Sequence, residues 1–301
     1  MDLKLVENIL EIAKENNITR AAEKLFITQS ALNQQLLKLE KELGTPLFYR
    51  SRADWRLTAA GELYVEGARD LIRIKKETYN KIHDVVETNK GILSIGFTPE
   101  RGVSMFVAIY PIFHKKFPNI LIKSIELSVK GQLEMITSGE LDIGILTISA
   151  NSKQNLQCVK ISSEELLLTI PQEHPLAKQA KIPFTELDIA QLKSAPFVLM
   201  YKKSTLRPII DEIFEIAGYQ PKVLFETSSN NVITTMIKSG VACGILPYSY
   251  VKDHLDQLAC FYLPTRPIWN IVACYRKDAY LSKAAQYFIK LATEYWVAES
   301  S

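Results

Sequence analysis

The first third of the chain places apolar residues at the spacing of short amphipathic helices. One face of a first helix is formed by Leu3, Val6, Leu10 and Ala13. Thr19 is the expected N-cap of a second short helix, which ends near Leu25, and Thr28 is the expected N-cap of a third. The pattern predicts three helices joined by short turns.

The third helix has one apolar side and one polar side. Its leucines fall together on a helical wheel: Leu32, Leu36, Leu39 and Leu43. The opposite side carries Gln29, Ser30, Asn33, Gln34 and Lys41. This polar side is either a binding surface or the solvated face of an ordinary helical bundle.

A hairpin and a long helix are expected next. Gly44 ends the third helix, and the following segment contains Leu47 and Phe48 as buried positions of a short hairpin or wing. From residue 59 to about residue 88 there is no proline, and a three-four apolar spacing links Val65, Ala68, Ile72, Tyr79, Ile82 and Val86. Such a helix packs either on a partner helix or on its own domain, and the spacing leaves both open.

After residue 91 short apolar runs alternate with helical segments. Strands are expected at 92–97, 120–127, 141–148, 166–170, 196–200, 222–227, 242–247 and 271–275. Helices are expected around 103–117, 130–138, 204–217, 230–239 and 281–297. The alternation predicts α/β sheets covered on both faces, and the length of this part favours two lobes.

Composition narrows the class of protein. Apolar residues make up 47% and charged residues 23% of the 301, which is typical of a globular protein, and the net charge of +3 restricts any nucleic-acid surface to a local patch. The four cysteines, Cys158, Cys243, Cys260 and Cys274, form no CxxC and are expected to be reduced and mostly buried. The histidines lack ligand spacing, so no metal or cofactor is expected.

The N-terminus reads as an amphipathic helix and not as a signal peptide, and no apolar run is long enough to span a membrane. A cytoplasmic location is therefore expected.

The polar side of the third helix suits the major groove of double-stranded DNA. Asn and Gln bond adenine bidentately, and a helix N-terminus donates N–H groups to phosphate. Arginines in the predicted wing would contact the DNA backbone or minor groove. The candidate DNA-binding residues are Thr28, Gln29, Ser30, Asn33, Gln34, Arg50, Arg52 and Arg56.

The first ninety residues resemble the winged helix-turn-helix of the LysR-type transcriptional regulators, and the resemblance continues along the chain. The matching residues are Ala21, Ala22, Leu25, Thr28, Gln29, Ser30, Leu36, Leu39, Glu40, Gly44, Leu47, Phe48, Arg50, Leu57, Thr58 and Gly61. The resemblance implies a DNA-binding domain at 1–58, a linker and dimerisation helix at 59–90, and an effector-binding domain at 91–301. It also implies a homodimer or homotetramer on an interrupted dyad operator.

For the C-terminal part, the resemblance implies a periplasmic-binding-protein-like fold. Lobe 1 would comprise 92–161 and 267–301, and lobe 2 would comprise 162–266. A small-molecule effector would bind beyond the carboxyl ends of the strands. It would be anionic, because helix N-termini and cations are expected there. The candidate contacts are Thr98, Ser128, Lys130, Ser204, Thr205 and Asn230. Ser and Thr at these positions would also serve as simple N-caps.

Other classes of protein account for less of the sequence. No hydrolase, P-loop or zinc-protease motif is present, so no catalytic residue is expected. A solute-binding protein would explain only residues 92–301. A DNA-binding regulator that responds to no effector remains an alternative.

The recognition helix departs from the family pattern in its charge. Members often carry Ser, Arg and a basic residue at the positions of Asn33, Gln34 and Leu37, and glycine at that of Ala53. Fewer cations on phosphate mean fewer counterions released on binding.

We therefore expect Gln34→Arg to steepen the salt dependence of DNA affinity by about one phosphate contact. Binding isotherms of both proteins on one duplex at several salt concentrations measure the slope. An unchanged slope would contradict this account of the helix.

Overall fold

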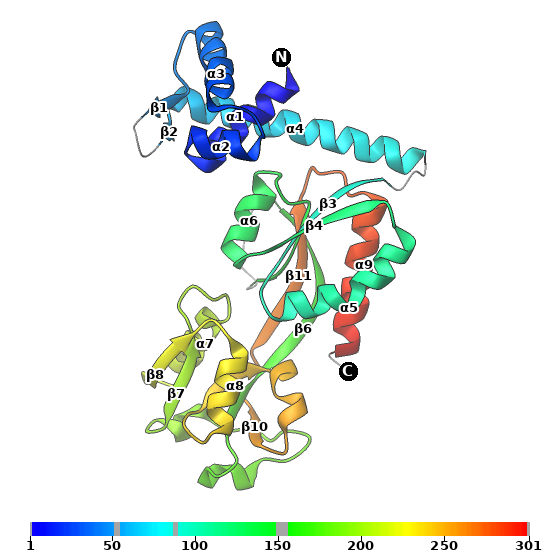
Figure 1. The fold of residues 1–301 in the computed structure, drawn as a ribbon. Coiled ribbons are helices and arrows are strands. Elements are labelled where there is room, and N and C mark those ends of the chain that lie inside the picture. The colour runs from blue at the N-terminus through cyan, green and yellow to red at the C-terminus, as the bar shows by residue number, and fades with distance from the viewer. Residues whose placement is uncertain (1, 51–54, 87–89, 149–155, 300–301) are drawn as a thin grey trace. The chain divides into compact units, whose positions relative to one another are not determined.

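The computed structural model describes residues 2–50, 55–86, 90–148 and 156–299 (Figure 1). The chain divides into two compact units. The first comprises residues 1–91 with 138–140, and the second comprises 92–137 and 141–301. Each unit is described by itself below.

The first unit begins with three helices whose caps are encoded locally. They are α1 (Leu3–Glu15), α2 (Ile18–Lys24) and α3 (Gln29–Leu43). Asn17, and not the expected Thr19, caps α2, because its side chain accepts from the backbone N–H groups of Thr19 and Arg20. Thr28 caps α3 as predicted, and Gly44 ends it in the left-handed conformation.

The leucine side of α3 forms the core of this unit together with α1 and α2. Leu32, Leu36 and Leu39 are buried, as the periodicity predicts. Leu43 was expected on the same side but is 45% exposed at the C-terminal end of the helix, next to Gly44. The amide side of α3 therefore faces away from a well-filled core.

A short antiparallel hairpin and a long helix complete the first unit. The hairpin strands are β1 (Phe48–Arg50) and β2 (Trp55–Leu57), and α4 (Ala59–Val85) follows with Thr58 as its N-cap. Leu47 and Phe48 are buried as predicted. Large apolar side chains remain exposed along α4, namely Leu63, Ile74, Tyr79, Ile82 and Val85.

The second unit is built on a seven-stranded mixed sheet. Its strands are β3 (Gly91–Phe97), β4 (Ile120–Glu126), β5 (Ile143–Ile148), β6 (Leu156–Pro171), β9 (Gly244–Pro247), β10 (Leu258–Tyr262) and β11 (Ile268–Arg276). The order is β10-β6-β11-β5-β3-β4, with β9 also paired to β6. A separate parallel pair is formed by β7 (Pro196–Met200) and β8 (Lys222–Thr227).

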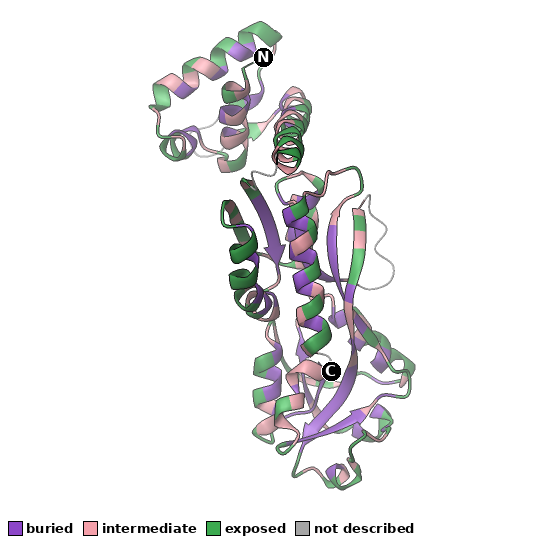
Figure 2. Ribbon diagram, turned by 90° about the vertical axis from the view of Figure 1, so that its right-hand side faces the viewer, coloured by how far each residue is buried: buried purple, intermediate pink, exposed green. Residues whose placement is uncertain are grey.

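The helices of this unit cover its sheets, and most strands are buried (Figure 2). They are α5 (Arg101–Lys116), α6 (Val129–Thr137), α7 (Arg207–Ile216), α8 (Asn230–Lys238) and α9 (Lys283–Glu299). α5 and α9 pack together on one face of β3, β5 and β11, while α6 covers the other face. Short 3-10 helices, including η3 (Tyr248–Tyr250), fill the connections.

Two hydrophobic cores define two lobes. One core takes buried residues from 93–161 and 271–296, and the other takes them from 166–269. The antiparallel strands β6 and β11 run through both lobes. Their pairing shifts where Ile271 faces Ser162 and Val272 faces Lys160, which leaves Ile161 as the extra residue of a β-bulge.

Two parts of the sheet were not predicted from the sequence. The strand expected at 166–170 begins ten residues earlier as β6, and β10 was not expected. The start of β6 is polar at most positions, whereas β10 is an apolar run like those that were predicted and was overlooked. Both are stabilised by partners distant in the chain.

The expectation of four reduced thiols is wrong for two of the cysteines. Cys158 of β6 lies directly opposite Cys274 of β11, and the two form a disulfide. The pairing depends on strand register, which the sequence does not show. Cys243 and Cys260 are free and buried, and burial raises the pKa of each thiol to about 12.

Within the described residues no group of His, Cys, Asp or Glu could hold a metal ion. No helix in the described ranges is sufficiently long and apolar to cross a membrane.

A thiol count tests the cysteine assignment. We expect Ellman's reagent to find no reactive thiol in the native protein and two in denaturant, rising to four only after reduction, because Cys243 and Cys260 are buried and protonated. Four thiols in denaturant without reductant would contradict the disulfide.

Candidate functional sites

The amide side of α3 is an accessible polar surface. Gln29, Ser30 and Gln34 are exposed and Asn33 is half-buried, while the leucines opposite are packed. Thr28 accepts from the backbone N–H of Ala31 and lies 3.1 Å from the hydroxyl of Ser30. The surface therefore combines amides, hydroxyls and a helix N-terminus, which are groups that bond base edges and phosphate.

The arginines of the hairpin differ in their surroundings. Arg50 forms an ion pair with the buried Glu40 and lies over the Trp55 ring, so it ties the hairpin to α3. Glu40 also accepts from the backbone N–H of Leu47 at 2.9 Å. Arg56 is exposed, and Arg52, like Ala53, lies outside the described residues.

Phe26, in the turn between α2 and α3, was not singled out by the sequence. Its side chain is 95% exposed and its backbone has a φ of 56°. A bulky residue in the left-handed region is strained, and an exposed phenyl ring gains nothing from burial. Phe26 therefore adds an exposed apolar side chain two residues before Thr28, the N-cap of α3.

A cavity of about 250 Å³ lies between the two lobes of the second unit. Lobe 1 contributes the loop after β3, the start of α6 and the end of β5. Lobe 2 contributes the loops after β7 and β8 together with Tyr250 and Trp269. Its lining residues are Thr98, Pro99, Glu100, Arg101, Ser128, Val129, Thr147, Met200, Tyr201, Lys203, Ser204, Thr205, Ser228, Ser229, Asn230, Tyr250 and Trp269. We call this cavity the interlobe cleft.

Five of the six expected effector contacts line the interlobe cleft: Thr98, Ser128, Ser204, Thr205 and Asn230. Thr205 is 2.7 Å from Thr147, which joins the lobes through two hydroxyls. Lys130 is not among the lining residues; its side chain is 88% exposed and pairs with Glu134. Ser128 and Ser204 also accept from backbone N–H groups, as the N-cap alternative predicts.

Arg101 is the most heavily contacted charged group beside the cleft. Its guanidinium forms a bidentate pair with Glu164, whose side chain is only 3% exposed, and lies 4.3 Å from the centre of the Trp296 ring. Ser249 donates to the same carboxylate at 3.1 Å. These contacts join α5, β6, η3 and α9 at the junction of the lobes.

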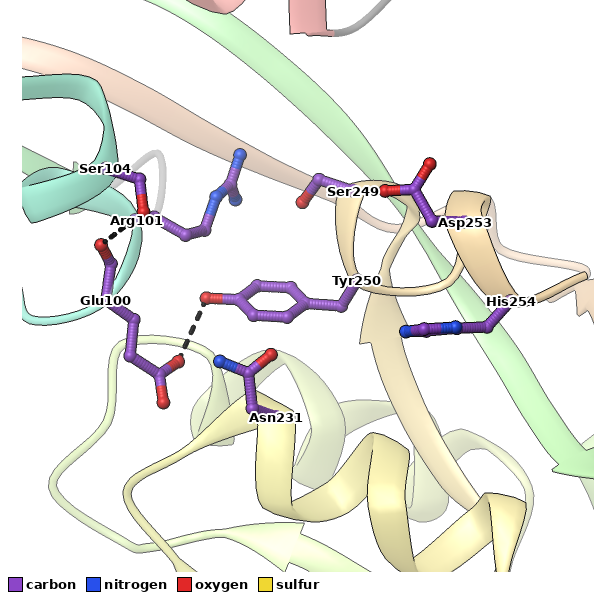
Figure 3. Close-up of a pocket in the computed structure, with 8 residues that line it drawn as sticks. All are labelled: Glu100, Arg101, Ser104, Asn231, Ser249, Tyr250, Asp253 and His254. Atoms are coloured by element: carbon purple, nitrogen blue, oxygen red, sulfur yellow. Dashed lines mark hydrogen bonds between the residues drawn. The ribbon is translucent and has the colours of Figure 1, made fainter. Parts of the chain in front are cut away.

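Glu100 belongs to lobe 1, and its side chain bonds two residues of lobe 2. Its carboxylate accepts from the hydroxyls of Ser229 and Tyr250, the latter at 3.2 Å (Figure 3). Burial raises the pKa of Tyr250, so its hydroxyl remains protonated and donates. The backbone of Glu100 has φ 62° and ψ −92°, a strained conformation that the contacts of Arg101 help to hold.

Two buried polar atoms of the cleft residues have no hydrogen-bond partner in the described part of the chain. They are Nε1 of Trp269, a residue 8% exposed, and Oδ1 of Asn230, which is 4% exposed. Leaving such a group unpaired costs about 1–3 kcal/mol. Both atoms are closed off from solvent, so they are not open to the cleft in this structure.

A second cavity, of about 220 Å³, adjoins the interlobe cleft. Glu100, Arg101 and Tyr250 line both cavities, so they separate one from the other. The remaining lining residues are Ser104, Asn231, Ser249, Asp253 and His254 (Figure 3).

The two units thus define a helix-turn-helix protein joined to a two-lobed α/β domain with a ligand-sized cleft. A family model described as the LysR substrate binding domain matches residues 87–297, and one described as a bacterial regulatory helix-turn-helix protein of the lysR family matches residues 3–62. The chain belongs to the LysR family. It is a DNA-binding transcriptional regulator with an effector-binding domain, and this family is not a class of enzymes.

Individual relatives agree with this assignment. The chain is 29% identical over 268 residues to the Hca operon transcriptional activator HcaR of Escherichia coli, covering 89% of this chain and 87% of HcaR. It is also 29% identical over 247 residues to the uncharacterized regulator YybE of Bacillus subtilis, covering 82% of each chain. Among solved structures, a full-length OxyR variant from Pseudomonas aeruginosa has a TM-score of 0.70 at 22% identity, covering 98% of this chain and 97% of that one. CbnR in complex with its target DNA has a TM-score of 0.60 at 19% identity, with 98% and 99% covered.

The buried pair beside the cleft yields a stability prediction. We expect Arg101→Ala to lower the free energy of unfolding by about 3–5 kcal/mol, because Glu164 would be left buried without its counterion. Lys290→Ala, which breaks an exposed pair with Glu294, serves as control and should change it by less than about 0.5 kcal/mol. Urea unfolding followed by circular dichroism measures both, and equal small effects would contradict the role of Arg101.

Proposed function

We propose that α3 reads the operator through Gln29, Ser30, Asn33 and Gln34, with Thr28 at its N-terminus on phosphate. The observation that supports this most directly is the exposed amide side of α3 opposite packed leucines. Arg52 and Arg56 of the wing would add backbone contacts, while Arg50 would act through the ion pair that holds the hairpin on α3.

Pairing of subunits is part of the proposal. α4 exposes several large apolar side chains along one helix, including Ile74, Tyr79 and Ile82. Such side chains favour burial against a second copy. A homodimer, or a homotetramer of two dimers, would present paired recognition helices to an interrupted dyad with half-sites about one helical turn, or a multiple of it, apart.

The interlobe cleft is the proposed effector site. A small molecule with an anionic group would face hydroxyls such as Ser128 and Thr205 near helix N-termini. Its binding would favour one arrangement of the lobes and so change how the subunits engage DNA. We also propose that the protein acts in the cytoplasm and without enzymatic activity.

Mobility shift on the promoter beside the protein's own gene, with and without a metabolite library, tests the proposed function. A shift that one metabolite alters, with a dyad footprint, supports it. A DNA shift that ignores every metabolite supports a regulator without an effector. Absence of any DNA shift would contradict the proposed recognition surface.

Base reading by α3 gives a specific prediction. Gln29→Ala or Asn33→Ala should relax base preference at one operator position by about 1–3 kcal/mol, the value of one bidentate pair. Arg52→Ala should instead weaken binding to all duplexes alike. Competition against single-base operator variants distinguishes these results, and a uniform loss for Gln29→Ala would contradict base contact.

A further inference from the structure

The charged groups that line the interlobe cleft do not match a simple anion. Arg101 is committed to Glu164, so its charge is already neutralised. Lys203 is an exposed cation at the cleft, and Glu100 adds a carboxylate. An anion without a positive group would be repelled by Glu100.

Glu100 has bonding capacity left for a ligand. Its two carboxylate oxygens accept from Ser229 and Tyr250, both neutral hydroxyls, and it forms no ion pair with any residue that the structure describes. An ionised carboxylate can accept about four hydrogen bonds. A ligand ammonium beside Glu100 would supply the missing counterion.

The hydroxyls of the cleft match a carboxylate on the same ligand. The oxygens of Ser128 and Ser204 accept from backbone N–H groups, so their O–H groups can donate to a ligand. Lys203 places a cation at the same cleft. The cleft therefore offers partners for a carboxylate as well as for an ammonium.

Part of the remaining lining is apolar and the space is small. Pro99, Val129 and Met200 line the cleft beside the Trp269 ring, in a cavity of about 250 Å³. These side chains suit a short hydrocarbon or aromatic group.

We propose that the interlobe cleft binds a zwitterion, namely an α-amino acid with an apolar side chain. Its ammonium lies against Glu100, and its carboxylate lies against the hydroxyls of Ser128 and Ser204. This inference rests on the proposed function, in which the cleft is the effector site.

Matched compounds test the charge requirement by calorimetry on the full chain. The first set is L-phenylalanine, 3-phenylpropanoate and 2-phenylethylamine, and the second is L-leucine, 4-methylpentanoate and 3-methylbutylamine. In at least one set the amino acid should bind about tenfold or more tightly than either partner, since each partner lacks one charge-assisted contact.

Variants assign the two ends of the ligand. Glu100→Gln should weaken binding of the amino acid about tenfold or more and spare the deaminated acid, whereas Ser204→Ala should weaken binding of both the amino acid and the deaminated acid. Glu134→Gln is the control, because this exposed residue of α6 is not among those lining the cleft. Far-ultraviolet circular dichroism and DNA binding verify that each variant is folded.

The outcomes test two statements separately: that the ligand is a zwitterion, and that the cleft is the effector site. If the deaminated acids bind as well as the amino acids and Thr205→Val abolishes that binding, the proposal of a zwitterionic ligand is wrong. The proposal that the cleft is the effector site is then retained. Equal binding of the amines also overturns the zwitterion. If no compound binds while DNA binding persists, the zwitterion is again overturned, and the metabolite screen then decides whether the cleft has any effector.

Discussion

The buried pair of Arg101 and Glu164 fixes the geometry of the effector-binding domain. Removing two charges from water is costly, and here bidentate geometry, the Ser249 hydroxyl and the face of Trp296 offset that cost. Because the contacts come from α5, β6, η3 and α9, they hold both lobes at one point. The adjacent Glu100 is thereby held in a conformation that it would not adopt alone.

In the DNA-binding unit, too, a positively charged side chain is paired with a residue of the protein itself. Arg50, which looks like a phosphate ligand in the sequence, is engaged by Glu40 and Trp55 and stabilises the hairpin. The first half of α3 exposes amides and a hydroxyl at Gln29, Ser30 and Gln34, and its exposed lysines, Lys38 and Lys41, lie in the second half. In the proposed function, recognition by the first half of α3 depends more on hydrogen-bond geometry than on the attraction of cations to phosphate.

Periodicity and capping predicted most of the elements because both are local properties of the sequence. Thr28 and Gly44 mark the ends of α3 correctly, whereas Asn17 was overlooked in favour of Thr19 because both are good caps two residues apart. The disulfide was missed because Cys158 and Cys274 are 116 residues apart and meet only through strand register.

Some residues of the cleft could likewise be predicted from neighbouring sequence, and others could not. Polar residues near predicted helix starts led directly to five of its lining residues, namely four Ser or Thr residues and Asn230. Glu100 and Trp269 carry no motif; they become recognisable only when Tyr250 and Asn230, from distant parts of the chain, are placed beside them. Chemical selectivity therefore could not be predicted from the sequence.

The β-bulge at Ile161 has a mechanical consequence. Strands β6 and β11 continue from one lobe into the other, and the bulge interrupts their hydrogen-bonded ladder between the two cores. Bending there disturbs fewer backbone bonds than bending elsewhere along the pair. A change in the angle between the lobes would therefore meet the least resistance from backbone hydrogen bonds at Ile161.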